Sequence, residues 1–159
     1  MAICAVVVFV ALYFVEAGYG KMISPKWGPA INNKVAWVLM ECPVFFVLFY
    51  FWINSSRQFE VVPLIFFLLF ELHYFQRSFI FPFLLKGKSK MPITIMLMGV
   101  TFNTINGYMQ GEWIFFLSPN NLYTENWLTT PQFIIGTILF FAGMAININS
   151  DYIIRHLRK

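Results

Sequence analysis

Five long apolar stretches dominate the sequence, at about 1–18, 35–53, 61–84, 91–110 and 131–149. Each reaches or approaches the ~20 residues that an α-helix needs to cross the hydrocarbon core of a bilayer. The chain is 59% hydrophobic and 11% charged. Soluble domains are about 25% charged, so this chain lacks the polar surface that contact with water on all sides requires. The sequence therefore predicts an all-α polytopic membrane protein with five transmembrane helices.

The basic residues predict how these helices are oriented. Nine of the eleven lysines and arginines lie in alternate connections, namely Lys21, Lys26 and Lys34, then Lys86, Lys88 and Lys90, then Arg155, Arg158 and Lys159. By the positive-inside rule these connections face the cytosol, and the N-terminus faces the lumen. Because the basic residues serve topology in this way, the net charge of +4 does not indicate a nucleic-acid surface.

The first stretch has two interpretations. Residues 15–17 (Val-Glu-Ala) fit the small-residue pattern of a signal-peptide cleavage site. However, no basic region precedes the apolar run, and its positive charges follow it. We therefore interpret 1–18 as a signal-anchor span.

The cysteines and histidines do not indicate a metal site or a disulfide framework. Cys4 and Cys42 both lie in apolar runs, where a disulfide framework is not expected. His73 and His156 are far apart in the sequence, and no ligand pair with zinc-site spacing accompanies them. The sequence therefore predicts no bound metal.

Polar side chains lie inside the apolar stretches, toward their predicted cytosolic ends. At a rise of ~1.5 Å per residue, Glu41 lies roughly 10 Å and Tyr74 roughly 18 Å from the nearest loop lysine, with Arg77 one turn shallower. Asn147 and Asp151 are one turn apart at the end of the fifth stretch. A charged side chain at the bilayer centre costs roughly 2.5–3.5 kcal/mol on insertion scales. We therefore expect these groups to share one polar cavity that opens to the cytosol.

Purely structural roles are open for several of these side chains. Glu41, as a neutral acid, can bond a neighbouring helix and serve packing alone. Arg77 can extend to the cytosolic headgroups as readily as it can make a functional contact. His73 fits an interhelical hydrogen-bond donor better than a catalyst. Asn106 and Gln110, one turn apart, can simply bond the backbone.

Five longer strings carry a family resemblance: AWVLMECP, HYFQRSFIFPFL, NGYMQG, ENWLTTPQFIIG and GMAININSDYIIRHLRK. Together they resemble the steroid 5α-reductase family, the 3-oxo-5α-steroid 4-dehydrogenases, over about 1–159. The resemblance implies a bundle of seven transmembrane helices around a cavity for NADPH and a steroid, in the endoplasmic reticulum with the cofactor side cytosolic. It also implies that 1–159 is the N-terminal, five-helix part of a transmembrane reductase domain. We expect this part alone to lack full cofactor affinity.

The resemblance also implies the site residues. It places Glu41 and Tyr74 at the C3 carbonyl of the substrate as the catalytic pair, and Trp37 and Phe102 in the wall of the steroid cavity. The cofactor-binding residues that it implies are Tyr19, Arg77, Asn147, Asp151 and Arg158.

The expected reaction is NADPH-dependent reduction of the Δ4 double bond of a 3-oxosteroid, with hydride added at C5 and a proton at C4. Negative charge then develops on the C3 oxygen, and one preorganised hydrogen-bond donor is worth ~3–4 kcal/mol at such an oxygen. Tyr74 is the expected donor, and Glu41 is a second donor or orients Tyr74.

Other functions are compatible with the same residues. Related polytopic reductases act on polyprenols or enoyl-CoA thioesters, and another apolar enone is an alternative substrate. A closed, aromatic-lined pocket of ~300–1,000 Å³ would favour a steroid, whereas a long slot that opens to lipid would favour a chain. In a different class, the polar groups would serve a small transporter or a non-enzymatic assembly subunit.

Overall fold

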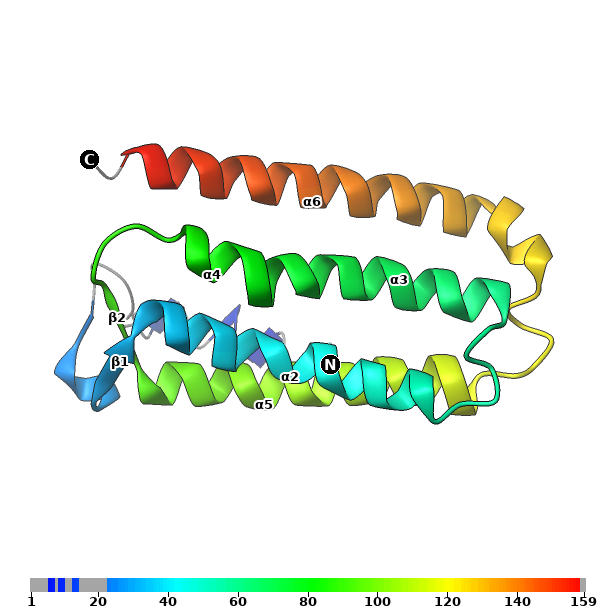
Figure 1. Ribbon diagram of the computed structural model, residues 1–159, viewed down its shortest axis with the longest axis horizontal. Helices are drawn as coiled ribbons and strands as arrows, with labels where there is room; N and C mark the ends of the chain where they lie inside the picture. Colours follow the sequence, from blue (N-terminus) through cyan, green and yellow to red (C-terminus); the bar gives the residue numbers. More distant parts are fainter. Residues whose placement is uncertain (1–5, 8, 11–12, 15–22, 158–159) are drawn as a thin grey trace.

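The computed structural model describes residues 6–7, 9–10, 13–14 and 23–157, and this part of the chain is mostly helical (Figure 1). Its long helical segments are α2 (Asn33–Ile53), α3 (Val61–Phe75) continued by a π-helical segment (Gln76–Ile80) and α4 (Phe81–Leu84), α5 (Ile93–Glu112) continued by a second π-helical segment (Trp113–Leu117), and α6 (Pro131–Leu157). Short 3-10 helices lie at Pro25–Trp27 and Glu125–Thr129. Figure 1 shows the long segments side by side, with their axes roughly aligned.

The predicted helices at 35–53, 61–84, 91–110 and 131–149 are confirmed as helices, but the last two segments continue beyond their predicted ends, to Leu117 and Leu157. Most of the first predicted stretch lies outside the described residues. Within the described part of the chain, three helices are long and apolar enough to cross a membrane: Asn33–Ile53, Val61–Leu84 and Pro131–Leu157. The more polar α5 is not among them, so the number of spans stays a prediction.

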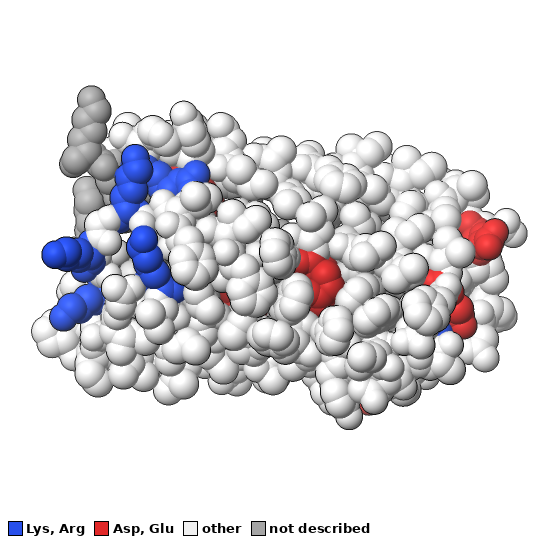
Figure 2. All heavy atoms as spheres, in the orientation of Figure 1, with Lys and Arg blue, Asp and Glu red and all other residues white. Residues whose placement is uncertain are grey.

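A two-stranded antiparallel sheet joins two of the lysine-containing loops. β1 (Ala30–Asn32) pairs with β2 (Lys90–Pro92), with Ala30 opposite Pro92 and Asn32 opposite Lys90. The pairing brings the loop before α2 and the loop before α5 to one end of the molecule, as the charge pattern requires. Figure 2 shows lysine and arginine side chains gathered at this end, which we call the basic end.

The closest helix packing is between α2 and α5, where glycines replace side chains. A Cβ atom added at Gly107 would lie 3.0 Å from the carbonyl oxygen of Val44, and one added at Gly111 would lie 2.6 Å from the Phe51 ring. Small residues four apart on one helix face let two backbones approach closely inside a membrane. The fully buried Val44 and Leu48 lie in the same stretch of α2. This pair of helices is the rigid scaffold of the site.

The last helix, α6, is held less tightly. Every residue of α6 stays at least partly exposed. Its aromatic contacts with α3 are the loose pairs Phe66–Phe133 and His73–Phe140, whose ring centroids are 6.1 and 6.4 Å apart. α6 also makes polar side-chain contacts near the basic end of the molecule.

Candidate active site

Arg77 lies in the π-helical segment of the third predicted span. Pro82 follows this segment, and a proline has no N–H to donate and crowds the carbonyl four residues before it. The α-helical hydrogen-bond ladder therefore cannot run unchanged through this part of the chain. Single π-helical turns inside helices are frequent at functional sites, and this one directs Arg77 toward the neighbouring helices.

The Arg77 guanidinium joins three helices. Its Nη1 lies 3.0 Å from Oδ2 of Asp151 and donates to Oδ1 of Asn147 at 3.3 Å, both on α6. Its central carbon lies 4.3 Å from the ring centroid of Phe81 and 4.8 Å from that of Trp37 on α2. Only 13% of the Arg77 side chain and 20% of the Asp151 side chain are exposed. We call these five residues the Arg77 cluster.

Two amide side chains of α5, one turn apart, donate hydrogen bonds to Glu41 and Tyr74. Asn106 Nδ2 donates to the Tyr74 hydroxyl oxygen at 3.2 Å. Asn103 Nδ2 donates to Oε2 of Glu41 at 3.2 Å and to the carbonyl of Met40 at 2.8 Å. Because the Tyr74 oxygen accepts the bond from Asn106, its own O–H is free to donate to another group. The two amides of α5 thus fix the carboxyl group of Glu41 on α2 and the hydroxyl group of Tyr74 on α3.

The structure brings four of the nine sequence-predicted site residues together in one cluster, and it bonds Glu41 and Tyr74 to α5. Trp37, Arg77, Asn147 and Asp151 meet in the Arg77 cluster. Phe102 lies apart, because 55% of its surface is exposed on α5.

Two predicted cofactor residues, Tyr19 and Arg158, lie outside the described residues. Sequence reasoning missed Asn103 entirely and allowed Asn106 a backbone bond, whereas Asn106 bonds the Tyr74 hydroxyl. Their spacing of three residues, which puts both on one helix face, was the available signal.

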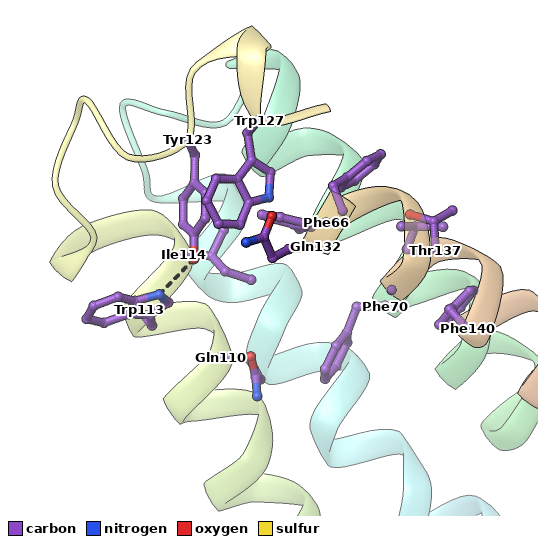
Figure 3. Close-up of a pocket in the computed structure, with 13 residues that line it drawn as sticks. Phe66, Phe70, Gln110, Trp113, Ile114, Tyr123, Trp127, Gln132, Thr137 and Phe140 are labelled. Atoms are coloured by element: carbon purple, nitrogen blue, oxygen red, sulfur yellow. Dashed lines mark hydrogen bonds between the residues drawn. The ribbon is translucent and has the colours of Figure 1, made fainter. Parts of the chain in front are cut away.

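A cavity of about 380 Å³ lies between α3, the end of α5, the loop before α6 and the start of α6 (Figure 3). Seven aromatic residues contribute to its wall: Phe66, Phe70, Trp113, Tyr123, Trp127, Phe133 and Phe140. Gln110, Gln132 and Thr137 add polar groups. The Phe70 ring lies 4.7 Å from the Tyr74 ring, centroid to centroid. This aromatic cavity therefore reaches the immediate neighbourhood of Tyr74.

A second, smaller pocket of about 200 Å³ lies at the basic end, beside the Arg77 cluster. Its wall includes Trp37, Arg77, Phe81 and Asp151 from that cluster, together with Asn33, Lys86 and Arg155. We call it the basic pocket. It provides cationic, anionic and amide groups next to two aromatic rings.

These features define a helical membrane protein with a polar site between its helices. The family model described as 3-oxo-5-alpha-steroid 4-dehydrogenase matches residues 89–159. The chain is 38% identical over 143 residues to 3-oxo-5-alpha-steroid 4-dehydrogenase 1 of Macaca fascicularis, covering 89% of this chain and 53% of that protein. It is 34% identical over 156 residues to steroid 5-alpha-reductase DET2 of Arabidopsis thaliana, covering 94% of this chain and 59% of the relative.

The chain is therefore similar over most of its length to 3-oxo-5-alpha-steroid 4-dehydrogenases, as its motifs indicated. A further relative, 3-oxo-5-alpha-steroid 4-dehydrogenase 1 of Homo sapiens, is 36% identical over 143 residues, covering 89% of this chain and 54% of that protein. The chain thus spans little more than half the length of these curated relatives.

Proposed function

We propose that residues 1–159 form the N-terminal, five-span part of a seven-helix membrane reductase that saturates the Δ4 double bond of 3-oxosteroids with NADPH. The observation that carries the proposal is the bonding of Tyr74 and Glu41 by Asn106 and Asn103, beside an aromatic cavity. The positive-inside pattern supports a lumenal N-terminus and a cytosolic basic end, in keeping with an enzyme of the endoplasmic reticulum.

The residues at the basic end fit NADPH. Arg77 and Arg155 are suited to phosphate oxygens because a guanidinium donates to them in charge-assisted hydrogen bonds. Asp151 and Asn147 have acceptor oxygens for ribose hydroxyl groups. When bound, NADPH supplies the hydride that adds to C5 of the steroid. Tyr19 and Arg158, which the family resemblance adds to this group, complete the proposed cofactor site.

Tyr74 activates the enone in this proposal. Its O–H donates to the C3 carbonyl oxygen, where negative charge develops as the β-carbon accepts hydride. Asn106 holds the hydroxyl oxygen, so that the donor is positioned before the reaction begins, and preorganisation of this kind is the source of catalytic stabilisation at an oxyanion. Glu41 in its protonated form is the second donor and is positioned by Asn103. The resulting enolate takes up a proton from solvent at C4, and the C3–O bond becomes the ketone of the product.

The aromatic cavity supports a compact ring substrate. Its volume of about 380 Å³ lies within the range of ~300–1,000 Å³ that is usual for sites of small organic ligands. Aromatic walls suit the flat, apolar body of a steroid. Trp37 and Phe102, which the family resemblance implies at the substrate, are not among the residues that line this cavity. The cavity is partly open, so its aromatic lining and its volume, not its enclosure, support a steroid over a polyprenol or an acyl chain.

The proposal is tested by Tyr74→Phe in the full-length protein, with testosterone or progesterone as substrate. The substitution keeps the ring and its packing against Phe70 and removes only the hydroxyl group. We expect kcat to fall by ~10²–10³-fold, which is typical for the loss of one oxyanion donor. Cofactor affinity should stay unchanged, because the hydroxyl group is bonded to Asn106 and not to the Arg77 cluster.

Tyr50→Phe is the matched control, because Tyr50 lies on α2 with 62% of its surface exposed. It should leave turnover unchanged. Turnover by the Tyr74→Phe variant at the wild-type rate would remove Tyr74 from the chemistry. Failure of the wild-type protein to bind NADPH would favour a transporter or an assembly subunit instead.

A further inference from the structure

The aromatic cavity extends from the neighbourhood of Tyr74 to the loop before α6. Phe70, in its wall, contacts Tyr74 with ring centroids 4.7 Å apart. Phe66, also in the wall, contacts Tyr123 at a centroid distance of 5.1 Å. Phe66 and Tyr74 are about two turns apart on α3, which corresponds to roughly 12 Å along the helix axis. We call the region around Tyr123 the far end of the cavity.

Gln132, near the start of α6, also belongs to the far end. Phe140 lies about two turns further along the same helix, and its ring centroid is 6.4 Å from that of His73, the neighbour of Tyr74 in the sequence. Gln132 and Phe140 therefore mark opposite ends of the wall that α6 contributes to the cavity. In Figure 3 the amide of Gln132 lies on the side of Tyr123, away from Phe140.

The polar groups of the far end are available to a ligand. The hydroxyl oxygen of Tyr123 accepts a hydrogen bond from Nε1 of Trp113 at 2.9 Å, so its own O–H is free to donate. The side-chain hydrogen bonds at the start of α6 are made by Thr130, and none within the described part of the chain involves the amide of Gln132. That amide can both donate and accept. A ligand that fills the cavity displaces water from both groups, so each then needs a polar atom of the ligand as its partner.

We infer that Gln132 and Tyr123 recognise an oxygen atom at the C17 end of the steroid, and so select 3-oxosteroids with a hydroxyl or carbonyl group there over steroids that lack one. This inference rests on the proposed function and deepens it, because it names the subclass of substrate. Carbons 3 and 17 lie at opposite ends of the fused rings, so a steroid whose C3 carbonyl meets Tyr74 directs C17 to the far end of the cavity.

The two side chains match such an oxygen atom in different ways. The Tyr123 O–H donates to the oxygen of a hydroxyl or a carbonyl group, whereas the Gln132 amide accepts from a hydroxyl group or donates to a carbonyl group. A site that hydrogen-bonds a substrate hydroxyl group discriminates against the analogue without it far more strongly than an apolar wall does. The far end therefore determines specificity, and Tyr74 at the other end carries the chemistry.

The test compares two substrates of the full-length protein that differ only in the 17β-hydroxyl group: testosterone, which carries it, and androst-4-en-3-one, which lacks it. We expect the wild-type kcat/KM to be ~30-fold higher for testosterone, the combined effect of two hydrogen bonds. Gln132→Leu should lower kcat/KM for testosterone by ~10-fold, and Tyr123→Phe by ~3-fold, each the effect of one hydrogen bond. Neither substitution should change kcat/KM for androst-4-en-3-one, because this steroid has no oxygen atom at the far end.

Gln58→Leu is the matched control, because Gln58 lies in the turn between α2 and α3 and is not part of the cavity wall. It should keep the wild-type preference for testosterone. If the wild-type protein reduces both steroids equally well, or if Gln132→Leu lowers both kcat/KM values by the same factor, the inference is wrong. The proposed function survives either result, because it requires only reduction of the Δ4 double bond. A wild-type protein that reduces neither steroid would overturn both, so the two failures are distinguishable.

Discussion

The two interior arginines, one at each end of the helices, are held in different ways. Arg57 lies in the turn between α2 and α3, where its Nη1 donates to the carbonyls of Ile114 and Ser118 at 3.2 Å and its Nε lies 2.9 Å from Oε2 of Glu60. Arg77 lies near the basic end and contacts side chains of α6, a helix without a buried residue. Arg57 bonds two backbone carbonyls as well as the side chains of Ser118 and Glu60. Arg77 bonds side chains beside a pocket.

The difference indicates that the end of the molecule at Arg57 stabilises the fold, whereas the end at Arg77 carries the proposed chemistry. We call them the structural end and the chemical end. Arg57 is bonded to the last turn of the α5 segment, next to the packed rings of Trp52, Phe67 and Phe115, so it closes a stable scaffold. Arg77 bridges that scaffold to α6, beside the basic pocket. A contact between a fixed part and a loosely packed helix can be made or broken at low cost. Substitutions at the two ends should therefore act on different measurements.

The largest expected effect on stability is that of Arg57→Ala. Removal of the guanidinium leaves the carbonyls of Ile114 and Ser118 short of donors and Glu60 without its partner. The Glu60 side chain is 46% exposed and regains water, so the cost comes from the lost buried hydrogen bonds, at about 1.5–3 kcal/mol for each bond to a charged group. We expect a large drop in the thermal unfolding midpoint of the detergent-solubilised full-length protein, followed by tryptophan fluorescence.

Arg77→Ala is the comparison variant for that measurement. It should lower the unfolding midpoint much less than Arg57→Ala does, because Arg77 bonds no backbone carbonyl of the scaffold. It should instead weaken NADPH binding. Equal losses of stability in the two variants would contradict the division into a structural end and a chemical end.

A smaller loss is expected from Gly107→Ala, which tests the scaffold directly. The added Cβ would lie 3.0 Å from the Val44 carbonyl oxygen and 3.2 Å from its Cα, both backbone atoms that cannot rotate away. Overpacking of this kind costs about 1–3 kcal/mol. Gly143→Ala is the control, because no atom lies within 4 Å of a Cβ built there, and it should leave the unfolding midpoint unchanged or raise it slightly.

The sequence predicted the helices well because a bilayer allows little else. In lipid, backbone groups must be hydrogen-bonded internally, so a long apolar stretch such as 61–84 is expected to form a helix. The helix Val61–Leu84 confirms this prediction. Charge patterning likewise placed the two lysine-containing loops at one end. It did not predict the β1–β2 pairing, since three-residue strands leave almost no periodic signal.

The candidate site was predicted in its residue types but not in its connections. Tyr74 and Glu41 were selected as polar groups in apolar stretches, whereas the partners that fix them, Asn106 and Asn103, depend on how α5 rotates against its neighbours. That rotation is set by the close approach at Gly107, a three-dimensional constraint. The exposed position of Phe102 on α5 follows from the same rotation.

The smallest expected effect concerns Glu71, which lies in α3 between the two ends. It is only 8% exposed, and neither carboxyl oxygen has a hydrogen-bond partner among the described residues. A polar group buried without a partner opposes folding, so Glu71→Leu should raise the stability of the full-length protein by about 1 kcal/mol. Glu71→Gln, which keeps the polarity and shape of the side chain, should leave stability nearly unchanged.

Steroid turnover measured on the same samples decides which region Glu71 belongs to. Unchanged turnover in Glu71→Leu would assign this residue to the scaffold, whereas a large loss of kcat at unchanged stability would extend the chemical end by one helical turn beyond Tyr74.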